Sequence, residues 1–226
     1  MSTDFKALRQ AMVTQQLMNR GITNSIVLAA MQKVPRENFV PDTERHAAYE
    51  DRPLPIGAGQ TISQPYIVAY MIEALQLKGS EKVLEVGAGS GYAAAVLAEI
   101  AIDVFSIERI AELAAQASAN LRNAGYPGVK IRHADGTQGW PKAAPFDAIL
   151  VSAGAPAKPH MLIKQLAIGG RLVVPIGDHP DKQRLIRITR TTDTTFAEEW
   201  LAHVRFVPLI GTDAWEDGNT PHLATI

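Results

Sequence analysis

The chain has 226 residues, of which 46% are hydrophobic and 20% charged, and its formal net charge at pH 7 is −1. It contains no cysteine, which excludes disulfides, thiolate catalysis and cysteine-ligated metals. The balanced charge gives no support for nucleic-acid binding, and no apolar run is long enough to span a bilayer. We therefore expect a cytoplasmic protein that uses neither nucleic acid nor membrane as a partner. Nothing in the composition sets the oligomeric state, and we favour a monomer.

Length and composition indicate a single domain over residues 1–226. We divide it into N-terminal helices and a substrate loop (1–79), an α/β core (80–183) and C-terminal strands with a tail (184–226). Apolar residues at helical spacing predict one amphipathic helix from Ser2 to Arg20. A second helix is predicted from near Asn24 to Val34, because the proline that follows disfavours a further helical residue. Residues 35–65 show no sustained period, so we predict a functional loop or lid there.

The next part of the chain alternates between β-branched runs and helix-forming runs. Strands are predicted at Lys82–Val86, Asp103–Ile107, Val129–Arg132, Ala148–Val151 and Arg171–Ile176. Helices are predicted at Ile67–Leu75, Tyr92–Ile100, Ala111–Asn123 and His160–Ala167. This alternation indicates parallel strands joined by right-handed crossovers, and hence an open, Rossmann-like α/β sheet. Two further strands, Leu185–Thr189 and Phe196–Val207, are joined by a short polar turn and are predicted to pair antiparallel.

A glycine-rich turn follows the first strand of the predicted sheet. Gly87, Gly89 and Gly91 alternate with Ala88 and Ser90 at the carboxyl edge of the strand, where ligands of open α/β sheets bind. The dinucleotide fingerprint requires a further glycine where this chain has Tyr92, so nicotinamide and flavin cofactors are disfavoured. By itself, this pattern is equally typical of a tight turn without a ligand.

Two acidic residues follow the next two strands at the same edge. Glu108 is placed to accept both ribose hydroxyls of a nucleoside, although an acid paired with Arg109 is the alternative. Asp135, followed by Gly136, is in reach of an adenine ring, although an ordinary turn residue would occupy the same place. No phosphate-binding G-x-x-x-x-G-K-[ST] motif is present. Together these features favour a nucleoside cofactor without phosphates, namely S-adenosylmethionine.

The segment before the first predicted core helix carries a more specific pattern. It reads Leu54-Pro55-Ile56-Gly57 and then Gln60-Thr61-Ile62-Ser63-Gln64-Pro65, and it is preceded by Val34-Pro35-Arg36-Glu37 and Phe39-Val40. With these runs the chain resembles the protein L-isoaspartate O-methyltransferase family. The resemblance continues through Leu84-Glu85-Val86-Gly87, Gly89-Ser90-Gly91-Tyr92, Ile107-Glu108-Arg109, Asp135-Gly136, Pro145-Phe146-Asp147-Ala148-Ile149 and Val204-Arg205-Phe206-Val207-Pro208-Leu209. The chain departs from the family pattern at Ala134 and over the tail, residues 211–226.

The resemblance implies a class I S-adenosylmethionine-dependent methyltransferase that esterifies the free carboxylate of L-isoaspartyl residues in damaged proteins and peptides. The ester then cyclises to a succinimide, which begins repair. Ser63 matches the active-site serine of the family, although capping of the following helix is its alternative role. The cofactor is expected to contact Gln60, Thr61, Ile62, Glu85, Gly87, Gly89, Ser90, Gly91, Glu108, Asp135 and Gly136. The substrate is expected to contact Leu54, Pro55, Ile56, Gly57, Val207 and Pro208.

Other kinds of site find less support. The six histidines contain no pair spaced three or four apart, so no metal is expected. Ser63 lacks a G-x-S-x-G elbow, which argues against a hydrolase. Residues 151–156 lack the polar-Pro-Pro-aromatic motif of methyltransferases that act on base amines. A small-molecule or RNA methyltransferase on the same fold stays open as an alternative, as does a regulatory module that binds the cofactor without turnover.

Overall fold

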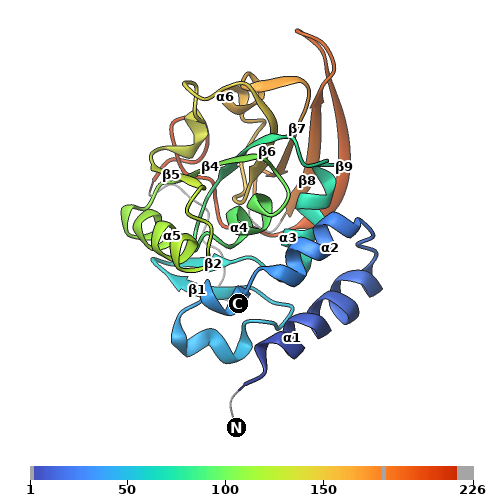
Figure 1. The fold of residues 1–226 in the computed structure, drawn as a ribbon. Helices are drawn as coiled ribbons and strands as arrows, with labels where there is room; N and C mark the ends of the chain where they lie inside the picture. Colours follow the sequence, from blue (N-terminus) through green and yellow to red (C-terminus); the bar gives the residue numbers. More distant parts are fainter. Residues whose placement is uncertain (1–2, 180–181, 218–226) are drawn as a thin grey trace.

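A computed structural model of the chain describes residues 3–179 and 182–217. Its centre is a sheet that, over these residues, has seven strands in the order β5-β4-β3-β6-β7-β8-β9 (Figure 1). The parallel strands are β3 (Lys82–Val86), β4 (Asp103–Glu108), β5 (Lys130–His133), β6 (Phe146–Val151) and β7 (Leu166–Ile176). The antiparallel strands that follow are β8 (Gln183–Arg190) and β9 (Phe196–Val204). The predicted fold class is confirmed.

Helices cover the two faces of this sheet unequally. One face packs against the main cluster of buried apolar residues, to which α4 (Tyr92–Ala98), α5 (Ala111–Asn123), α2 (Ser25–Lys33) and α3 (Pro65–Ala74) contribute. The other face packs against a smaller cluster with α6 (His160–Ile163). Successive strand residues enter opposite clusters, as Val83 and Leu84 do, because side chains alternate across a sheet. Within the described residues, no helix is long and apolar enough to cross a bilayer.

In the N-terminal region the second predicted helix is confirmed, whereas the first is divided into shorter segments. Three helical segments succeed one another there: α1 (Phe5–Ala11), a π-helical turn (Met12–Leu17) and a 3₁₀ turn (Met18–Arg20). Asp4 caps α1, and Ser2, where the prediction began, lies outside the described residues. Helix α2 is capped by the Asn24 side chain, which accepts from two backbone N–H groups.

Two predictions of local structure were wrong. Residues 35–65 contain 3₁₀ helices at Arg36–Asn38 (η3) and Asp42–Ala47 (η4) and a hairpin of β1 (Leu54–Gly57) and β2 (Gln60–Ile62). The strands are too short and irregular to give an alternating pattern, since the register shifts between Pro55 and Gly57. The helix predicted to reach Ala167 ends at Ile163, because β7 already begins at Leu166 and residues 167–170 bulge out of it.

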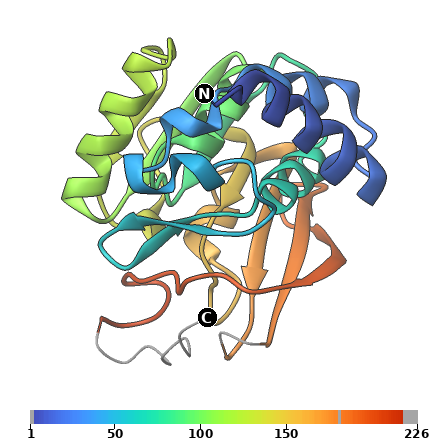
Figure 2. The same cartoon turned by 90° about the horizontal axis from the view of Figure 1, so that it is seen from below.

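The β1–β2 hairpin lies between the N-terminal helices and the C-terminal segment (Figure 2). Its buried residues Leu54, Ile56 and Ile62 belong to the main apolar cluster. Hydrophobic burial of one face therefore fixes the hairpin to the helices, while the residues after it turn toward the carboxyl edge of the sheet.

A substitution at Gly136, which follows β5, tests how tightly the carboxyl edge of the sheet is packed. A Cβ atom there would lie 2.6 Å from Cγ1 of Val86 in β3. We expect Gly136→Ala to lower the free energy of unfolding by about 1–3 kcal/mol, because Val86 lies in a buried central strand that cannot yield freely. Gly128→Ala is the control, since a Cβ there meets nothing within 4 Å. Urea unfolding of both variants measures the difference, and equal midpoints would contradict the packing argument.

Candidate active site

The glycine turn brings the backbone between β3 and α4 close to its neighbours. Gly89 and Gly91 have φ angles of +53° and +90°, which side-chain-bearing residues rarely adopt. A Cβ on Gly89 would lie 3.2 Å from Cδ1 of Ile56, and one on Gly91 would lie 3.1 Å from Cγ of Leu121. Gly91 thus permits close packing of α4 on α5, and Gly89 permits close approach of Ile56 in β1 to the turn.

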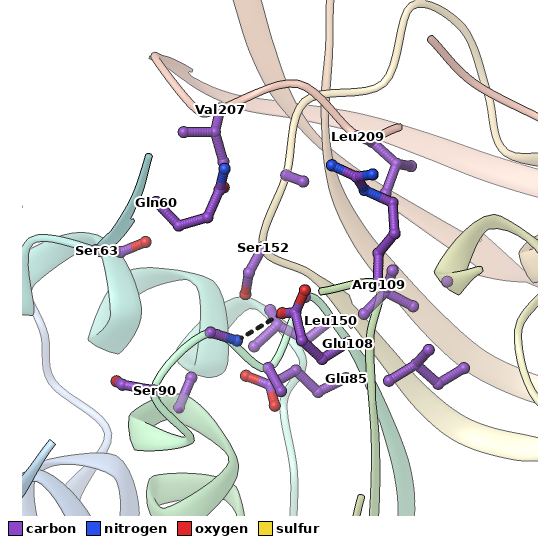
Figure 3. A pocket seen from close by; sticks show the side chains of 18 of the residues that line it. Gln60, Ser63, Glu85, Ser90, Glu108, Arg109, Leu150, Ser152, Val207 and Leu209 are labelled. Atoms are coloured by element: carbon purple, nitrogen blue, oxygen red, sulfur yellow. Dashed lines mark hydrogen bonds between the residues drawn. The ribbon is translucent and has the colours of Figure 1, made fainter. Parts of the chain in front are cut away.

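Glu108 ends β4 beside this turn, and only 7% of it is exposed. One carboxylate oxygen accepts a 2.9 Å hydrogen bond from the backbone N–H of Gly89, drawn in Figure 3. The other accepts from the N–H of Ile110 at 2.9 Å. Arg109 does not pair with Glu108 but with Asp217, at 3.0 Å. The structure therefore does not support the alternative of an acid paired with its neighbour, and Glu108 faces the ligand side of the sheet.

Glu85 is a second carboxyl group in the same pocket, and it is fully buried. It lies on β3 opposite Ser106 of β4, whose hydroxyl donates to one of its oxygens. Its other oxygen, Oε1, has no hydrogen-bond partner within the described chain. Burial raises the pKa of Glu85 to about 8, and the nearby Glu108 adds to the rise while Ser106 opposes it. Glu85 is therefore largely neutral at pH 7 and keeps one free acceptor.

Ser63 lies between β2 and α3, and its side chain is half-buried. It does not cap α3. The backbone N–H of Tyr66 instead donates to the Asp51 carboxylate, which also accepts from the Gln64 side chain and pairs with Arg20. Within the described chain no partner holds the Ser63 hydroxyl, and Figure 3 shows it pointing into the pocket. The structure thus leaves this hydroxyl free for a ligand.

Together these groups line a pocket at the carboxyl edge of the sheet. In Figure 3, Gln60, Ser63 and Val207 lie on one side of it, and Glu85 and Glu108 lie on the other. The predicted residues found in its wall are Gln60, Thr61, Ile62, Ser63, Glu85, Gly87, Gly89, Ser90, Glu108, Gly136, Val207 and Pro208.

Six other predicted residues are not brought to this wall. Leu54, Pro55, Ile56 and Gly57 form β1, in which Leu54 and Ile56 are 0% and 2% exposed in the apolar core, whereas Pro55 and Gly57 are exposed. Gly91 and Asp135 also lie outside the wall. The Asp135 carboxylate accepts from the backbone and hydroxyl of both Thr137 and Thr212. Burial alone would raise the pKa of Asp135, but these hydrogen bonds outweigh it and lower that pKa.

Sequence reasoning missed several residues of the wall. Ser152 follows β6, and its position after a strand at the carboxyl edge was a usable signal. Ile210 directly follows the run from Val204 to Leu209 that carries the resemblance, and it gave no signal of its own. The side-chain amide of Gln183 fixes this segment by pairing with both the backbone N–H and the carbonyl of Phe206, at 2.7 and 3.0 Å.

A second groove adjoins the cavity. Thr61, Ser63, Ser152 and Val207 line both, so the cavity and the groove meet at Ser63. The groove continues along Tyr66 and Tyr70, whose rings stack at 5.8 Å, and along residues 201–206. Within the described residues, no three His, Asp or Glu side chains are grouped as a metal site would require.

Comparisons with known proteins agree with this geometry. The family model for protein-L-isoaspartate(D-aspartate) O-methyltransferase matches residues 7–214. Protein-L-isoaspartate O-methyltransferase 2 of Marinobacter nauticus is 59% identical over 94% of this chain and 97% of its own. Protein-L-isoaspartate O-methyltransferase 1 of Rhodopseudomonas palustris is 59% identical over 95% of this chain and 87% of its own.

A solved structure is similar in three dimensions. It is a putative protein-L-isoaspartate O-methyltransferase from Plasmodium falciparum in complex with S-adenosyl-L-homocysteine. It has a TM-score of 0.78 and 27% identity, and the match covers 92% of this chain and 99% of that one. Sequence, family model and structure agree over nearly the same residues, and the chain therefore belongs to the protein-L-isoaspartate(D-aspartate) O-methyltransferase family.

Proposed function

We propose that this chain transfers a methyl group from S-adenosylmethionine to the free α-carboxylate of L-isoaspartyl residues in damaged proteins and peptides. Membership of the family carries the reaction and its cofactor. The observation in the structure that supports it best is the position of the free Ser63 hydroxyl, at the junction of the pocket beside the glycine turn and the adjoining groove. A cofactor and a polypeptide can thus meet at one side chain.

The residues of the cavity fit S-adenosylmethionine. Gly89 lines the pocket, the Glu108 carboxylate suits a pair of ribose hydroxyls, and the unpaired Oε1 of Glu85 suits an N–H donor or a positive charge. We assign Gln60, Thr61, Ile62, Ser90 and Gly136 to the same site. When bound, the cofactor supplies a methyl group that its own sulfonium activates.

The chain itself then has little proton chemistry to perform. A carboxylate with an ordinary pKa near 4 is almost wholly ionised at pH 7, so it needs no general base. The Ser63 hydroxyl donates a hydrogen bond that orients one carboxylate oxygen, and residues 207–210 exclude water from the opposite side. Orientation of this kind can contribute on the order of 7–11 kcal/mol to lowering the barrier.

The groove accounts for selection between isoaspartate and aspartate. The two differ in the path of the backbone and not in charge, so the polypeptide must be recognised through its main chain. We assign this recognition to Thr61, Ser63 and the segment 201–207, with Tyr66 and Tyr70 as the apolar floor. Of residues 54–57, which we expected to contact the peptide, Leu54 and Ile56 pack in the core, while the exposed Pro55 and Gly57 remain assigned to the peptide.

A matched pair of short peptides tests the function directly. One carries L-isoaspartate and the other L-aspartate at the same position, and kcat/KM is measured for each with labelled S-adenosylmethionine. We expect at least a hundredfold preference for the isoaspartyl peptide, because several mispaired groups would each cost about 1–3 kcal/mol. Equal rates would contradict repair. Cofactor binding without methylation of either peptide would favour an RNA or small-molecule substrate.

Ser63→Ala tests the role of the free hydroxyl. We expect kcat on the isoaspartyl peptide to fall between about fivefold and a hundredfold, because charge is neutralised rather than developed as the methyl group arrives. Cofactor affinity should stay within about threefold of wild type, and the melting temperature should not change, because Asp51 already caps α3. The exposed Ser80 provides the control, Ser80→Ala. Full activity of Ser63→Ala would remove Ser63 from the site.

Glu85→Gln separates stability from binding. The pKa of Glu85 is about 8 in the folded chain and near 4.5 when unfolded, so folding opposes its ionisation. The resulting loss of folding free energy is absent at a pH below the pKa of Glu85 in the unfolded chain. It grows as the pH rises and is complete above about pH 8. We expect the variant to be more stable than wild type by at least about 2 kcal/mol at pH 8, and by less at pH 5.

The same variant should bind S-adenosylmethionine at least about tenfold more weakly, because a donor or positive charge of the cofactor beside Oε1 would favour ionisation of Glu85, which an amide cannot undergo. Thermal melts at pH 5 and pH 8 and calorimetric titration with the cofactor measure the two effects. Unchanged affinity together with the stability gain would show that Glu85 is buried without serving the cofactor.

A further inference from the structure

One buried charge lies outside the pocket wall, and the reaction described above does not use it. Arg36 begins η3 and is 0% exposed. It forms no ion pair with any residue that the structure describes, and one of its nitrogens, Nη1, has no hydrogen-bond partner there. Burial lowers the pKa of its guanidinium, and the nearby Tyr92, Tyr49 and Asp51 offset this only in part. An unpaired buried charge destabilises a fold, and an apolar side chain would fill the space at a lower cost.

The contacts of Arg36 converge on the site. Its Nη2 donates to the backbone carbonyl of Ser63 at 2.8 Å, and its Nε donates to the carbonyl of Ala48 at 2.7 Å. Its Cζ lies 4.8 Å from the ring centroid of Tyr92, the first residue of α4 after the glycine turn. One planar group therefore contacts the backbone of the substrate side and the start of the helix on the cofactor side.

The Ser63 backbone has little other support on this side. The β1–β2 ladder ends at the pair Leu54 and Ile62, and α3 begins only at Pro65. Ser63 thus lies in a short link between two regular elements, and Arg36 is the donor that satisfies its carbonyl. A shift of this carbonyl would turn the Ser63 side chain away from its direction in the pocket.

We propose that Arg36 is a positioning residue for the methyl transfer, which holds the Ser63 hydroxyl in line by fixing the Ser63 backbone relative to Ala48 and Tyr92. This inference rests on the proposed function. The positioning role requires a guanidinium in particular, because the planar guanidinium group donates hydrogen bonds in two fixed directions while its face stacks on an aromatic ring. A lysine ammonium at the same place keeps the charge but cannot hold both carbonyls and the ring contact.

Arg36→Lys and Arg36→Gln test the proposal in the full-length enzyme. We expect each to lower kcat on the isoaspartyl peptide by at least about tenfold, since misplacement by an ångström costs rates of this order. The dissociation constant for S-adenosylmethionine should stay within about threefold, since Arg36 is not in the pocket wall. Arg187→Lys is the matched control, because Arg187 donates to the Ala74 carbonyl at the other end of α3, at 3.1 Å. It should keep the wild-type kcat.

A double-mutant cycle with Ser63→Ala distinguishes positioning from general support. If Arg36 acts through Ser63, Arg36→Lys should lower kcat by less than about threefold in the Ser63→Ala background. Additive losses would overturn the proposal, as would wild-type kcat in both Arg36 variants or failure of both to fold in the presence of S-adenosylhomocysteine. A wild-type enzyme that does not methylate the isoaspartyl peptide would count against the proposed function instead.

Discussion

Parallel pairing of β3 with both β4 and β6 places the ends of these three strands at one level. The registers Val86 with Ile107 and Val86 with Val151 bring the glycine turn, Glu108 and Ser152 to the same edge of the sheet. The glycine turn, Glu108 and Ser152 therefore line the pocket simply because each follows or ends one of these strands. The N-terminal hairpin and the C-terminal segment add walls to this edge, and they depend on it for their position.

The site holds two carboxyl groups with different surroundings. Glu108 accepts hydrogen bonds from two backbone N–H groups, whereas Glu85 has one oxygen without a partner in the described chain and a pKa that burial raises. Arg36 adds a buried positive charge behind Ser63 without pairing to either. These buried ionisable groups cost stability in the empty protein, and they gather around one cavity, as expected where a fold gives up stability for binding.

The C-terminal segment shows how a wall can be built without regular structure. Gly154 donates to the carbonyl of Val207 and accepts from the N–H of Leu209, each at 2.8 Å. Further along, Thr212 donates to the Asp135 carboxylate and the Trp215 indole donates to the Gly154 carbonyl. Asp135 therefore serves the segment that closes the pocket, although its place after β5 led us to expect a ligand contact.

The sequence by itself determined the parallel sheet, the glycine turn and the position of Glu108 at the end of a strand. Hydrophobic periodicity, turn residues and the ends of strands are all local properties of a sequence. The motif around Ser63 likewise indicated the family. Only the tertiary structure decided that Leu54 and Ile56 enter the core, that Asp51 and not Ser63 caps α3, and that Asp135 binds the tail. These outcomes depend on partners distant in sequence, as when Asp135 meets Thr212, and local patterns carry no information about which distant segment will satisfy a carboxylate or cover an apolar face.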